Sequence, residues 1–468
     1  MQDRSTMKIV CLLIGLTGTF FSAAQPLAVE LNASLNQIEK DEQFRHSILS
    51  LYVVDSKSGA VVFDKNSRLG LAPASCQKIV ISASAFEILG HDYVYKTPVM
   101  LYHLQDSQYL FIAGSGDPTL GSWRWPRTKM NVVCNDIVEA LNTRHIRLLG
   151  YEITMINNKF AFQPVPDGWI WQDIGNYYGA GARTFNWHEN QYDLILSSGN
   201  NEGDSTEIKA FEPSSATIPL LNFITTGKKG SGDNAYIYPG AFSNAAYATG
   251  TIPPEQSRFI ISGAMPFPEE AFISELKLKL NSSGIRINNG TYPVSLSRNL
   301  RSSSLETIIE LTSPPLDSIN FWFLKKSVNL YGEALVKTMA SEKTGMGSTD
   351  TGINIIKDLW KEKGIERSEL NIMDGCGLSP ANRVTGHALV TIMQYAKKQK
   401  WFNSFLTALP EINGLKMKDG YISGVRSFTG YVKSRNGNEY SFSFIVNNFD
   451  GSPATVREKM WKILDILK

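Results

Sequence analysis

The amino-acid sequence predicts an α+β fold in which one antiparallel sheet is built from both ends of the chain, with a large, mostly β region inserted between them. Three observations support this prediction. A helix, a pair of strands and a second helix follow one another near the N-terminus, and a hairpin followed by a helix closes the chain. Residues 97–299 differ from both ends of the chain in their sequence pattern, which predicts short strands between clusters of Gly, Pro, Asn and Ser.

The first residues have the pattern of a cleaved export signal. Arg4 and Lys8 form a basic start, the run IVCLLIGLTGTFF is apolar but too short to span a bilayer, and Ser22 and Ala24 are small residues suited to cleavage. We therefore expect residues 1–24 to be a signal peptide, cleaved near Ala24, and the protein to be periplasmic. No later stretch is apolar over about 18 residues, so we expect no integral membrane segment in the mature chain.

The first elements of the mature chain are a helix and a hairpin. Residues 29–44, VELNASLNQIEKDEQF, place Leu31, Leu35 and Ile38 on one side of a helix. Residues 47–66, SILSLYVVDSKSGAVVFDKN, predict two strands around a Ser-Gly turn.

The next stretch, LAPASCQKIVISASAFEILG at residues 71–90, predicts a mostly buried helix that begins near Ser75 and stops at Gly90. Lys78 lies one turn after Ser75, so the two side chains share a face of this helix. A serine that caps the helix and a lysine that reaches solvent would give the same pattern. The spacing alone is weak evidence, because it occurs at Ser5/Lys8, Ser75/Lys78 and Ser274/Lys277.

The central region, residues 97–299, contains one clear helical stretch, NDIVEALNTRH at residues 135–145. The remainder predicts short strands, and it contains no internal repeat. Residues 167–187, DGWIWQDIGNYYGAGARTFNW, are dense in aromatic side chains, which we interpret as a core or a domain interface. The sequence does not indicate how this region divides into domains.

Three stretches of the C-terminal part place polar residues at the ends of elements. Residues 324–340 predict a helix with Ser327 and Asn329 at its entry, and residues 374–385, DGCGLSPANRVT, predict a loop. Lys418-Asp419-Gly420 opens a strand in which the glycine marks a close backbone approach. A hairpin that turns at Asn436-Gly437 and a helix at residues 455–468 complete the chain.

Together these stretches resemble a known family. Three motifs follow one another along the chain, Ser75-x-x-Lys78, Ser327-x-Asn329 and Lys418-Asp419-Gly420. Further segments match the same family in the same order, namely LFIAGSGDPTL, WIWQDIGNYYGAGARTFNWHEN, SPPLDSINFWFLKKSVNLYGEAL and DGCGLSPANRVT. The chain resembles the D-alanyl-D-alanine carboxypeptidase/endopeptidase family, the class C low-molecular-mass penicillin-binding proteins, or DacB-like serine DD-peptidases.

The resemblance implies a β-lactamase/transpeptidase-like catalytic domain, with helices on both faces of its antiparallel sheet, made of residues 25–96 and 300–468. It places one or two smaller domains in residues 97–299. It also implies a hydrolase of peptidoglycan that cleaves D-Ala-D-Ala termini or stem-peptide cross-bridges through an acyl-enzyme on Ser75. Peptidoglycan stem peptides and β-lactams would be its partners, and no cofactor or metal is expected.

The residue types of the first motif fit this chemistry. A serine hydroxyl is a weak nucleophile and needs a neighbouring base. A lysine can act as that base if burial and nearby positive charge lower its pKa, because burial disfavours the ammonium form. An apolar helix would keep Lys78 dry, and the spacing aims its amine at Ser75.

The resemblance implies roles for the other motif residues. Ser327 would pass a proton to the leaving amine, and Asn329 would hold Lys78 and the substrate amide. Lys418 would supply positive charge for the substrate's terminal carboxylate, and Gly420 would let a peptide lie against the strand edge. The backbone N–H of Tyr421, with that of the nucleophilic serine, would form the oxyanion hole.

Asp419 departs from the family pattern, which usually has Thr or Ser at that position. An ionised carboxylate has no hydrogen to donate and repels a substrate carboxylate. Asp419 therefore points elsewhere, favours a substrate with no free carboxylate at that spot, or weakens the activity. Cys376 stands where the family commonly has Ser, and we interpret it as a small packed residue.

Composition excludes several other classes of protein. The formal charge of +2 gives no indication of binding to nucleic acid. The mature chain keeps three cysteines, too few and odd in number for a disulfide scaffold, and no Cys/His/Asp spacing predicts a metal site. Two alternatives stay open: a β-lactamase on the same fold, and a wall-binding protein with weakened turnover. The sequence does not indicate an oligomeric state.

Overall fold

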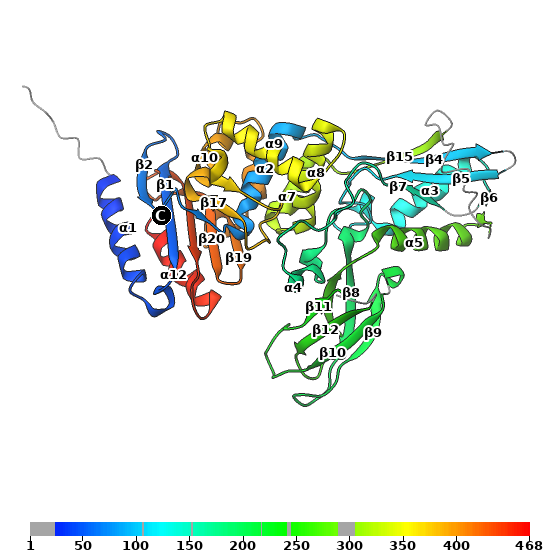
Figure 1. The fold of residues 1–468 in the computed structure, drawn as a ribbon, viewed down its shortest axis with the longest axis horizontal. Helices are drawn as coiled ribbons and strands as arrows, with labels where there is room; N and C mark the ends of the chain where they lie inside the picture. Colours follow the sequence, from blue (N-terminus) through cyan, green and yellow to red (C-terminus); the bar gives the residue numbers. More distant parts are fainter. Residues whose placement is uncertain (1–23, 105–106, 151–152, 217, 241–244, 289–304) are drawn as a thin grey trace, which may run out of the picture.

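The computed structural model describes residues 24–104, 107–150, 153–216, 218–240, 245–288 and 305–468 (Figure 1). Residues 1–23 of the predicted signal peptide lie outside the described part of the chain, and the first helix, α1, begins at Ala24. Among the described residues, none of the helices has both the length and the apolar character that crossing a bilayer requires.

One antiparallel sheet joins the two ends of the chain, with strands in the order β18, β19, β20, β21, β1, β2 (Figure 1). β1 pairs with β21 over all eight of its residues, so an N-terminal strand lies directly beside a C-terminal one. The predicted α+β fold, with a sheet built from both termini, is therefore confirmed. The strands are β1 (Ile48–Asp55), β2 (Val61–Lys65), β18 (Glu411–Ile412), β19 (Leu415–Ile422), β20 (Val425–Lys433) and β21 (Glu439–Asn447).

Helices cover both faces of this sheet. α1 (Ala24–Ile38) and α12 (Pro453–Asp465) pack on one face, where Leu31, Leu35 and Ile38 join a buried cluster with apolar residues of the strands, as the helical spacing predicts. α10 (Gly386–Ala396) packs on the other face. Because both faces are covered, the central strand β21 is buried along nearly its whole length.

α2 (Lys78–Leu89) lies inside a layer of helices and not on a surface. Every one of its residues from Lys78 to Phe86 is buried, so the helix has no solvent-facing side. This rules out the alternative in which Lys78 extends to solvent. The surrounding helices are α7 (Leu316–Lys325), α8 (Asn329–Thr344), α9 (Thr349–Glu362) and α11 (Phe402–Ala408).

The inserted region extends away from the six-stranded sheet, on the far side of the helical layer (Figure 1). One of its sheets has the order β15, β4, β5, β7, and helices α3 and α5 pack beside it. The predicted helix at residues 135–145 is part of α3, whereas α5 was not predicted. The bounds are β4 (Lys96–Leu104), β5 (Ser107–Ala113), β7 (Thr154–Ile156), β15 (Leu305–Thr312), α3 (Met130–Thr143) and α5 (Pro268–Ser282).

Two small sheets form the rest of the inserted region, with strand orders β13, β8, β9 and β10, β12, β11. Apolar residues from these sheets and from the four-stranded sheet form one continuous buried cluster. The bounds are β8 (Gln191–Ser197), β9 (Glu207–Glu212), β10 (Leu220–Thr226), β11 (Tyr236–Tyr238), β12 (Ala246–Ile252) and β13 (Phe259–Ala264), and a further pair, β6 (Leu148–Leu149) and β14 (Arg286–Ile287), lies at the far end.

The chain returns from the inserted region later than the predicted boundary. That boundary, at residue 299, falls among residues 289–304, which lie outside the described part of the chain. The next element, β15, pairs antiparallel with β4, and its Ile308 and Leu311 belong to the inserted region's buried cluster. A strand cannot be separated from the sheet that supplies its hydrogen bonds, so the region extends to about Thr312.

Candidate active site

Ser75 lies in a tight turn before a helix and does not cap that helix. The turn is a short 3₁₀ segment, Ala74–Gln77, and α2 follows it directly without a side-chain cap. Ala74 has a φ of +44°, a left-handed conformation that residues other than glycine seldom adopt. Such strain persists where neighbouring contacts hold it, and here Ser427 Oγ of β20 donates a hydrogen bond to the Pro73 carbonyl.

Lys78 is the first residue of α2, and its side chain is fully buried. Its Nζ atom lies 3.0 Å from Ser75 Oγ, 2.7 Å from Asn329 Oδ1 and 2.7 Å from the Cys376 carbonyl oxygen. Three acceptors from three separate segments therefore fix the amine within hydrogen-bond distance of the serine hydroxyl. A base that takes a proton from a nucleophile needs this geometry.

The surroundings of Lys78 also favour its neutral form. Burial lowers the pKa of the Lys78 amine to about 8, and the nearby charge of Lys418 acts in the same direction. The charges of Asp374 and Glu333 act to raise this pKa, but less strongly than burial lowers it. Roughly a tenth of the amine is then neutral at pH 7, compared with about three parts in ten thousand at its ordinary pKa.

Ser327 and Asn329 lie where the chain enters α8, as the sequence predicts. Asn329 Oδ1 accepts a hydrogen bond from Lys78, and Asn329 Nδ2 donates one of 2.8 Å to the Tyr178 carbonyl of the inserted region. Ser327 has a φ of +57° and lines the same cavity as Ser75. Within the described part of the chain its hydroxyl has no hydrogen-bond partner, so it is free to bind a group in the cavity.

The loop that begins at Asp374 is organised around that buried carboxylate. Six donors reach its two oxygens: Gln77 Nε2, Trp169 Nε1, Asn382 Nδ2 and the backbone N–H groups of Cys376, Gly377 and Ser379. These bonds hold the loop in the shape that points the Cys376 carbonyl at Lys78. The Cys376 side chain is fully buried, in keeping with its interpretation as a packed residue.

The same loop and helix α8 together supply the one group of possible metal ligands found among the described residues. Ligand atoms of Glu333, Asp374 and Cys376 lie within 4.8 Å of one another, and all three side chains are buried. Asp374 already accepts six hydrogen bonds, more than the four lone-pair sites that a carboxylate offers. Burial raises the pKa of Glu333, which favours its protonated form and makes it a poor cation ligand.

Gly420 brings β19 against the Ser75 turn. A Cβ atom at this position would lie 2.3 Å from Ser427 Oγ, 2.7 Å from the Pro73 carbonyl oxygen and 2.9 Å from the Ser75 backbone nitrogen. The predicted close backbone approach is therefore present, and the segment that approaches Gly420 is the chain's own turn at Pro73–Ser75. This approach also places the backbone of β19 beside the Ser75 N–H, as an oxyanion hole made with Tyr421 requires.

Lys418 and Asp419 form an ion pair within β19. The buried Lys418 Nζ lies 2.7 Å from the Asp419 carbonyl oxygen and 3.2 Å from Asp419 Oδ1, and Arg426 Nη2 of β20 lies 3.9 Å from Asp419 Oδ2. Burial acts to raise the pKa of the Asp419 carboxyl, but the two cations outweigh it and keep that pKa below its usual value. Neither Lys418 nor Asp419 lines the cavity at Ser75.

The cavity beside Ser75 has a volume of about 660 Å³ and lies between the catalytic part and the inserted region. One wall consists of Ser75, Lys326–Leu330, Gly377, Leu378, Pro380 and Tyr421–Ser423. The inserted region supplies the other wall, with Arg124, Ile170, Gln172, Asp173, Tyr177, Tyr178, Glu189, Gln191 and Tyr236. Ser75 is therefore reached through a cavity that neither part forms alone.

The aromatic stretch at residues 167–187 has two roles. Trp169, Phe185 and Trp187 are buried, which agrees with its interpretation as a core or interface. The short helix α4 (Trp171–Ile174) and the residues beside it instead border the cavity, and Tyr177 is 54% exposed. The contact between the Tyr178 carbonyl and Asn329 was not predicted. Every residue has a backbone carbonyl, so the residue type does not indicate which carbonyl accepts a hydrogen bond.

Sequence comparison with known proteins finds D-alanyl-D-alanine carboxypeptidases, the family that the motifs resemble. The profile of the D-Ala-D-Ala carboxypeptidase 3 (S13) family matches residues 31–416. A D-alanyl-D-alanine carboxypeptidase of Actinomadura sp. (strain R39) is 24% identical to the chain over 479 aligned positions, which cover 94% of this chain and 85% of that protein. The D-alanyl-D-alanine carboxypeptidase DacB of Haemophilus influenzae is 19% identical, with 83% of each chain covered.

Solved structures share the fold. The crystal structure of penicillin binding protein 4 (dacB) from Haemophilus influenzae superposes with a TM-score of 0.76 at 17% identity, covering 94% of this chain and 98% of that one. A second crystal structure of the same protein, in complex with a novel β-lactam, superposes with a TM-score of 0.71 at 16% identity and covers 93% of this chain.

Proposed function

The chain belongs to the D-Ala-D-Ala carboxypeptidase 3 (S13) family, and from this premise we propose that it is a serine DD-peptidase of peptidoglycan metabolism. It hydrolyses D-Ala-D-Ala termini, stem-peptide cross-bridges, or both, through an acyl-enzyme on Ser75. The observation that carries the proposal is the 3.0 Å contact between Ser75 Oγ and the fully buried amine of Lys78. Residues 1–24 support export, and we propose that the enzyme works in the periplasm.

The first half of the reaction forms the acyl-enzyme. Ser75 Oγ attacks the carbonyl carbon of the scissile amide while the neutral amine of Lys78 takes the hydroxyl proton. Negative charge gathers on the former carbonyl oxygen, where the N–H groups of Ser75 and Tyr421 stabilise it. The C–N bond then breaks, and the leaving amine receives the proton from Lys78 by way of the Ser327 hydroxyl, which leaves an ester on Ser75 and a neutral Lys78.

The second half of the reaction releases the acid. Lys78 takes a proton from a water molecule as the water oxygen adds to the ester carbonyl. Collapse of this intermediate breaks the bond to Ser75 Oγ, which recovers its proton from Lys78. The net change is one amide and one water converted to one carboxylic acid and one amine. A β-lactam would acylate Ser75 in the same way, with its own ring nitrogen as the leaving group.

The substrate backbone would add to the free edge of β19. Short β18 pairs with β19 only at Leu415 and Lys416, so within the described parts of the chain no strand lies beside the edge of β19 from Lys418 onward. An extended peptide bound there gains backbone hydrogen bonds and has its scissile carbonyl next to the Ser75 turn. The inserted wall of the cavity then faces the side chains of the stem peptide.

A weakened carboxypeptidase is the second candidate, and Asp419 is the observation that favours it. Its ion pair with Lys418 takes up part of the positive charge that a terminal carboxylate would need. Cleavage of cross-bridges is then the preferred reaction.

Two measurements test the proposed function. A fluorescent penicillin is expected to label the wild-type protein on the tryptic peptide that contains Ser75, and mass spectrometry of defined muropeptides incubated with the protein is expected to show loss of D-Ala or opening of cross-bridges. Labelling that survives Ser75→Ala would remove Ser75 from its role. Labelling without any turnover of muropeptides would leave a binding protein, and rapid release of the penicilloyl group would indicate a β-lactamase.

A further inference from the structure

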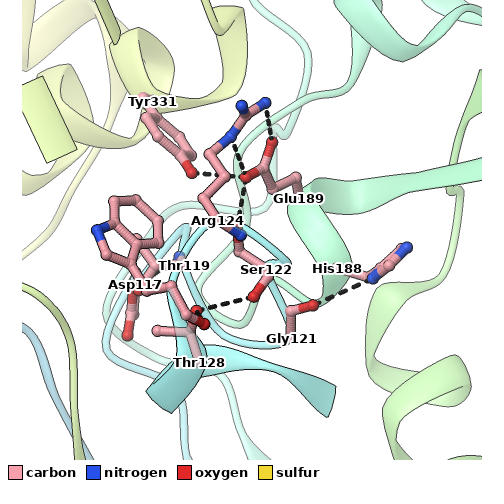
Figure 2. Close-up of polar contacts among 10 residues, drawn as sticks. Asp117, Thr119, Gly121, Ser122, Arg124, Thr128, His188, Glu189 and Tyr331 are labelled. Atoms are coloured by element: carbon pink, nitrogen blue, oxygen red, sulfur yellow. Dashed lines mark hydrogen bonds and ion pairs between the residues drawn. The ribbon is translucent and has the colours of Figure 1, made fainter. Parts of the chain in front are cut away.

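A buried ionic cluster joins the inserted region to helix α8, away from the atoms that contact the Ser75 hydroxyl (Figure 2). The Glu189 carboxylate accepts four hydrogen bonds: 2.6 Å from Ser122 Oγ, 2.7 Å from Arg124 Nε, 3.0 Å from Arg124 Nη2 and 2.7 Å from the Tyr331 hydroxyl. Glu189 is only 4% exposed, and Tyr331 is fully buried. Three of these donors belong to the inserted region, and the fourth belongs to α8.

The backbone at Glu189 is held in a strained shape. His188, Glu189 and Asn190 have φ values of +52°, +53° and +49°, three consecutive left-handed residues without a glycine. Contacts on both sides hold this turn, because His188 N donates to the Leu120 carbonyl and Met265 N donates to the Asn190 carbonyl. Figure 2 shows the Glu189 side chain turned towards Tyr331 and Arg124 while the His188 ring points the other way, to Gly121.

Stability alone is a weak reason for this arrangement. Buried ion pairs contribute little net stability, because desolvation of the two charges offsets most of their attraction. Strained backbone is instead found where a side chain has to be held in one place. The side chain held here belongs to Tyr331, in the same first turn of α8 as Asn329, whose amide contacts both Lys78 and the Tyr178 carbonyl.

The opposite side of that turn has no room to move. A Cβ atom at Gly332 would lie 2.4 Å from the Gly375 carbonyl oxygen, so α8 packs tightly against the loop that supplies the Cys376 carbonyl to Lys78. The first turn of α8 is thus enclosed between that loop and the Glu189 cluster. Its position decides where the Asn329 amide and the Ser327 hydroxyl lie relative to Lys78.

We propose that Glu189, in the inserted region, is a positioning residue for the reaction at Ser75, acting through the Tyr331 hydroxyl on the first turn of α8. The inserted region thereby has a part in the chemical step as well as in forming a wall of the cavity. This inference rests on the proposed function, because the step it affects is acylation of Ser75.

The test compares two variants, each of which lacks one buried tyrosine hydroxyl. In both cases the lost hydrogen bond has one partner on α8. Tyr331→Phe breaks the bond to Glu189, whereas Tyr95→Phe breaks the 2.9 Å bond between Tyr95 and Thr338, about two turns further along the same helix. Stopped-flow acylation by a chromogenic β-lactam separates the dissociation constant of the first complex from the acylation rate constant. We expect Tyr331→Phe to lower the rate constant about tenfold with the dissociation constant unchanged, and Tyr95→Phe to alter neither.

Thermal unfolding of both variants measures how much stability each lost hydrogen bond costs. We expect similar decreases in Tm for the two variants. Equal acylation rate constants in wild type and Tyr331→Phe, or equal losses in the two variants, would overturn the proposal. If Tyr331→Phe fails to fold, Glu189→Ala keeps the test decisive, because by itself it should lower the acylation rate constant about tenfold. If Tyr331→Phe folds, adding it to Glu189→Ala should lower the rate constant no further. A wild-type protein that no β-lactam acylates would instead contradict the proposed function.

Discussion

At the scale of single residues, the amine of Lys78 is the group on which the chemistry depends. Three acceptors hold it, and burial keeps its pKa near 8. Lys78→Arg keeps the positive charge but replaces the amine with a guanidinium that does not lose its proton. We expect acylation by a penicillin to slow by about two orders of magnitude or more, measured as the rate of adduct formation. Acylation near the wild-type rate would mean that Lys78 has only a structural role.

The same pKa predicts how the rate depends on pH. Burial lowers the pKa of Lys78 to about 8, and only the neutral amine accepts the Ser75 proton. The acylation rate constant is therefore expected to be low at pH 6, to rise through a midpoint near pH 8, and to level off above it. Stopped-flow rates between pH 6 and pH 9 give this profile, with circular dichroism to verify the fold at each pH. A rate that is flat across this range would contradict Lys78 as the base.

Asp419 allows a prediction in the direction of increased activity. Its carboxylate lies 3.2 Å from Lys418 Nζ, and it cannot donate a hydrogen bond to a substrate carboxylate. Asp419→Thr removes the competing charge and adds a hydroxyl donor, so we expect kcat/KM for D-Ala release from a D-Ala-D-Ala peptide to rise by roughly one to two orders of magnitude.

Asp419→Val separates these two effects, because Val has the shape of Thr and removes the charge without adding a hydrogen-bond donor. We expect it to fall between the wild type and Asp419→Thr in steady-state D-Ala release. If Asp419→Thr leaves the rate unchanged or lowers it, Asp419 has no influence on the carboxylate site, and the weakened-carboxypeptidase alternative loses its support.

At the scale of elements, the contact of β19 with the Ser75 turn depends on Gly420. Gly420→Ala would place a methyl group 2.7 Å from the Pro73 carbonyl oxygen and 2.9 Å from the Ser75 nitrogen, so the strand and the turn have to separate. We expect a loss of stability of about 1–3 kcal/mol in urea unfolding and loss of most penicillin labelling.

Gly430→Ala is the matched control on the neighbouring strand β20. Its methyl group would lie 2.4 Å from the Lys416 carbonyl oxygen and 2.4 Å from Met417 Cβ, a similar overlap that involves β19 and no atom of the Ser75 turn. It should cost comparable stability while each folded molecule keeps its labelling. Equal labelling by the two alanine variants would show that the Gly420 contact does not shape the site.

At the scale of the whole molecule, α8 joins the catalytic part to the inserted region. The buried Lys337 Nζ donates to three carbonyl oxygens of the inserted region, those of Gln163, Pro164 and Ala182. Lys337→Met keeps the length of the side chain but leaves these carbonyls without a donor. We expect a loss of about 2–4 kcal/mol in urea unfolding, compared with under about 0.5 kcal/mol for Lys343→Met at an exposed position of the same helix. Similar stabilities of the two variants would contradict this account.

The sequence by itself determined the elements whose signals are local. Apolar spacing identified α1, and turn residues identified the hairpins β1–β2 and β20–β21, because both patterns lie within about 20 consecutive residues. The order of the motifs at Ser75, Ser327 and Lys418 identified the family. The structure brings Ser75, Ser327 and Asn329 to one cavity, which Lys418 does not line. The sequence left open whether Lys78 reaches solvent, and the structure decided this by burying its side chain completely.

Only the tertiary structure decided how these segments meet. Lys78 donates to the backbone carbonyl of Cys376, and Asn329 donates to that of Tyr178. Because every residue has a backbone carbonyl, no side-chain pattern predicts which carbonyls make these contacts. Glu189 lies 142 positions from Tyr331 along the chain, and a pairing at that distance leaves no periodicity. β15 belongs to the inserted region because of the strand with which it pairs. These features arise from packing between segments that are distant in the sequence. Such packing depends on the complementary shapes of the segments and on buried hydrogen bonds, and a pattern over a few neighbouring residues predicts neither of these.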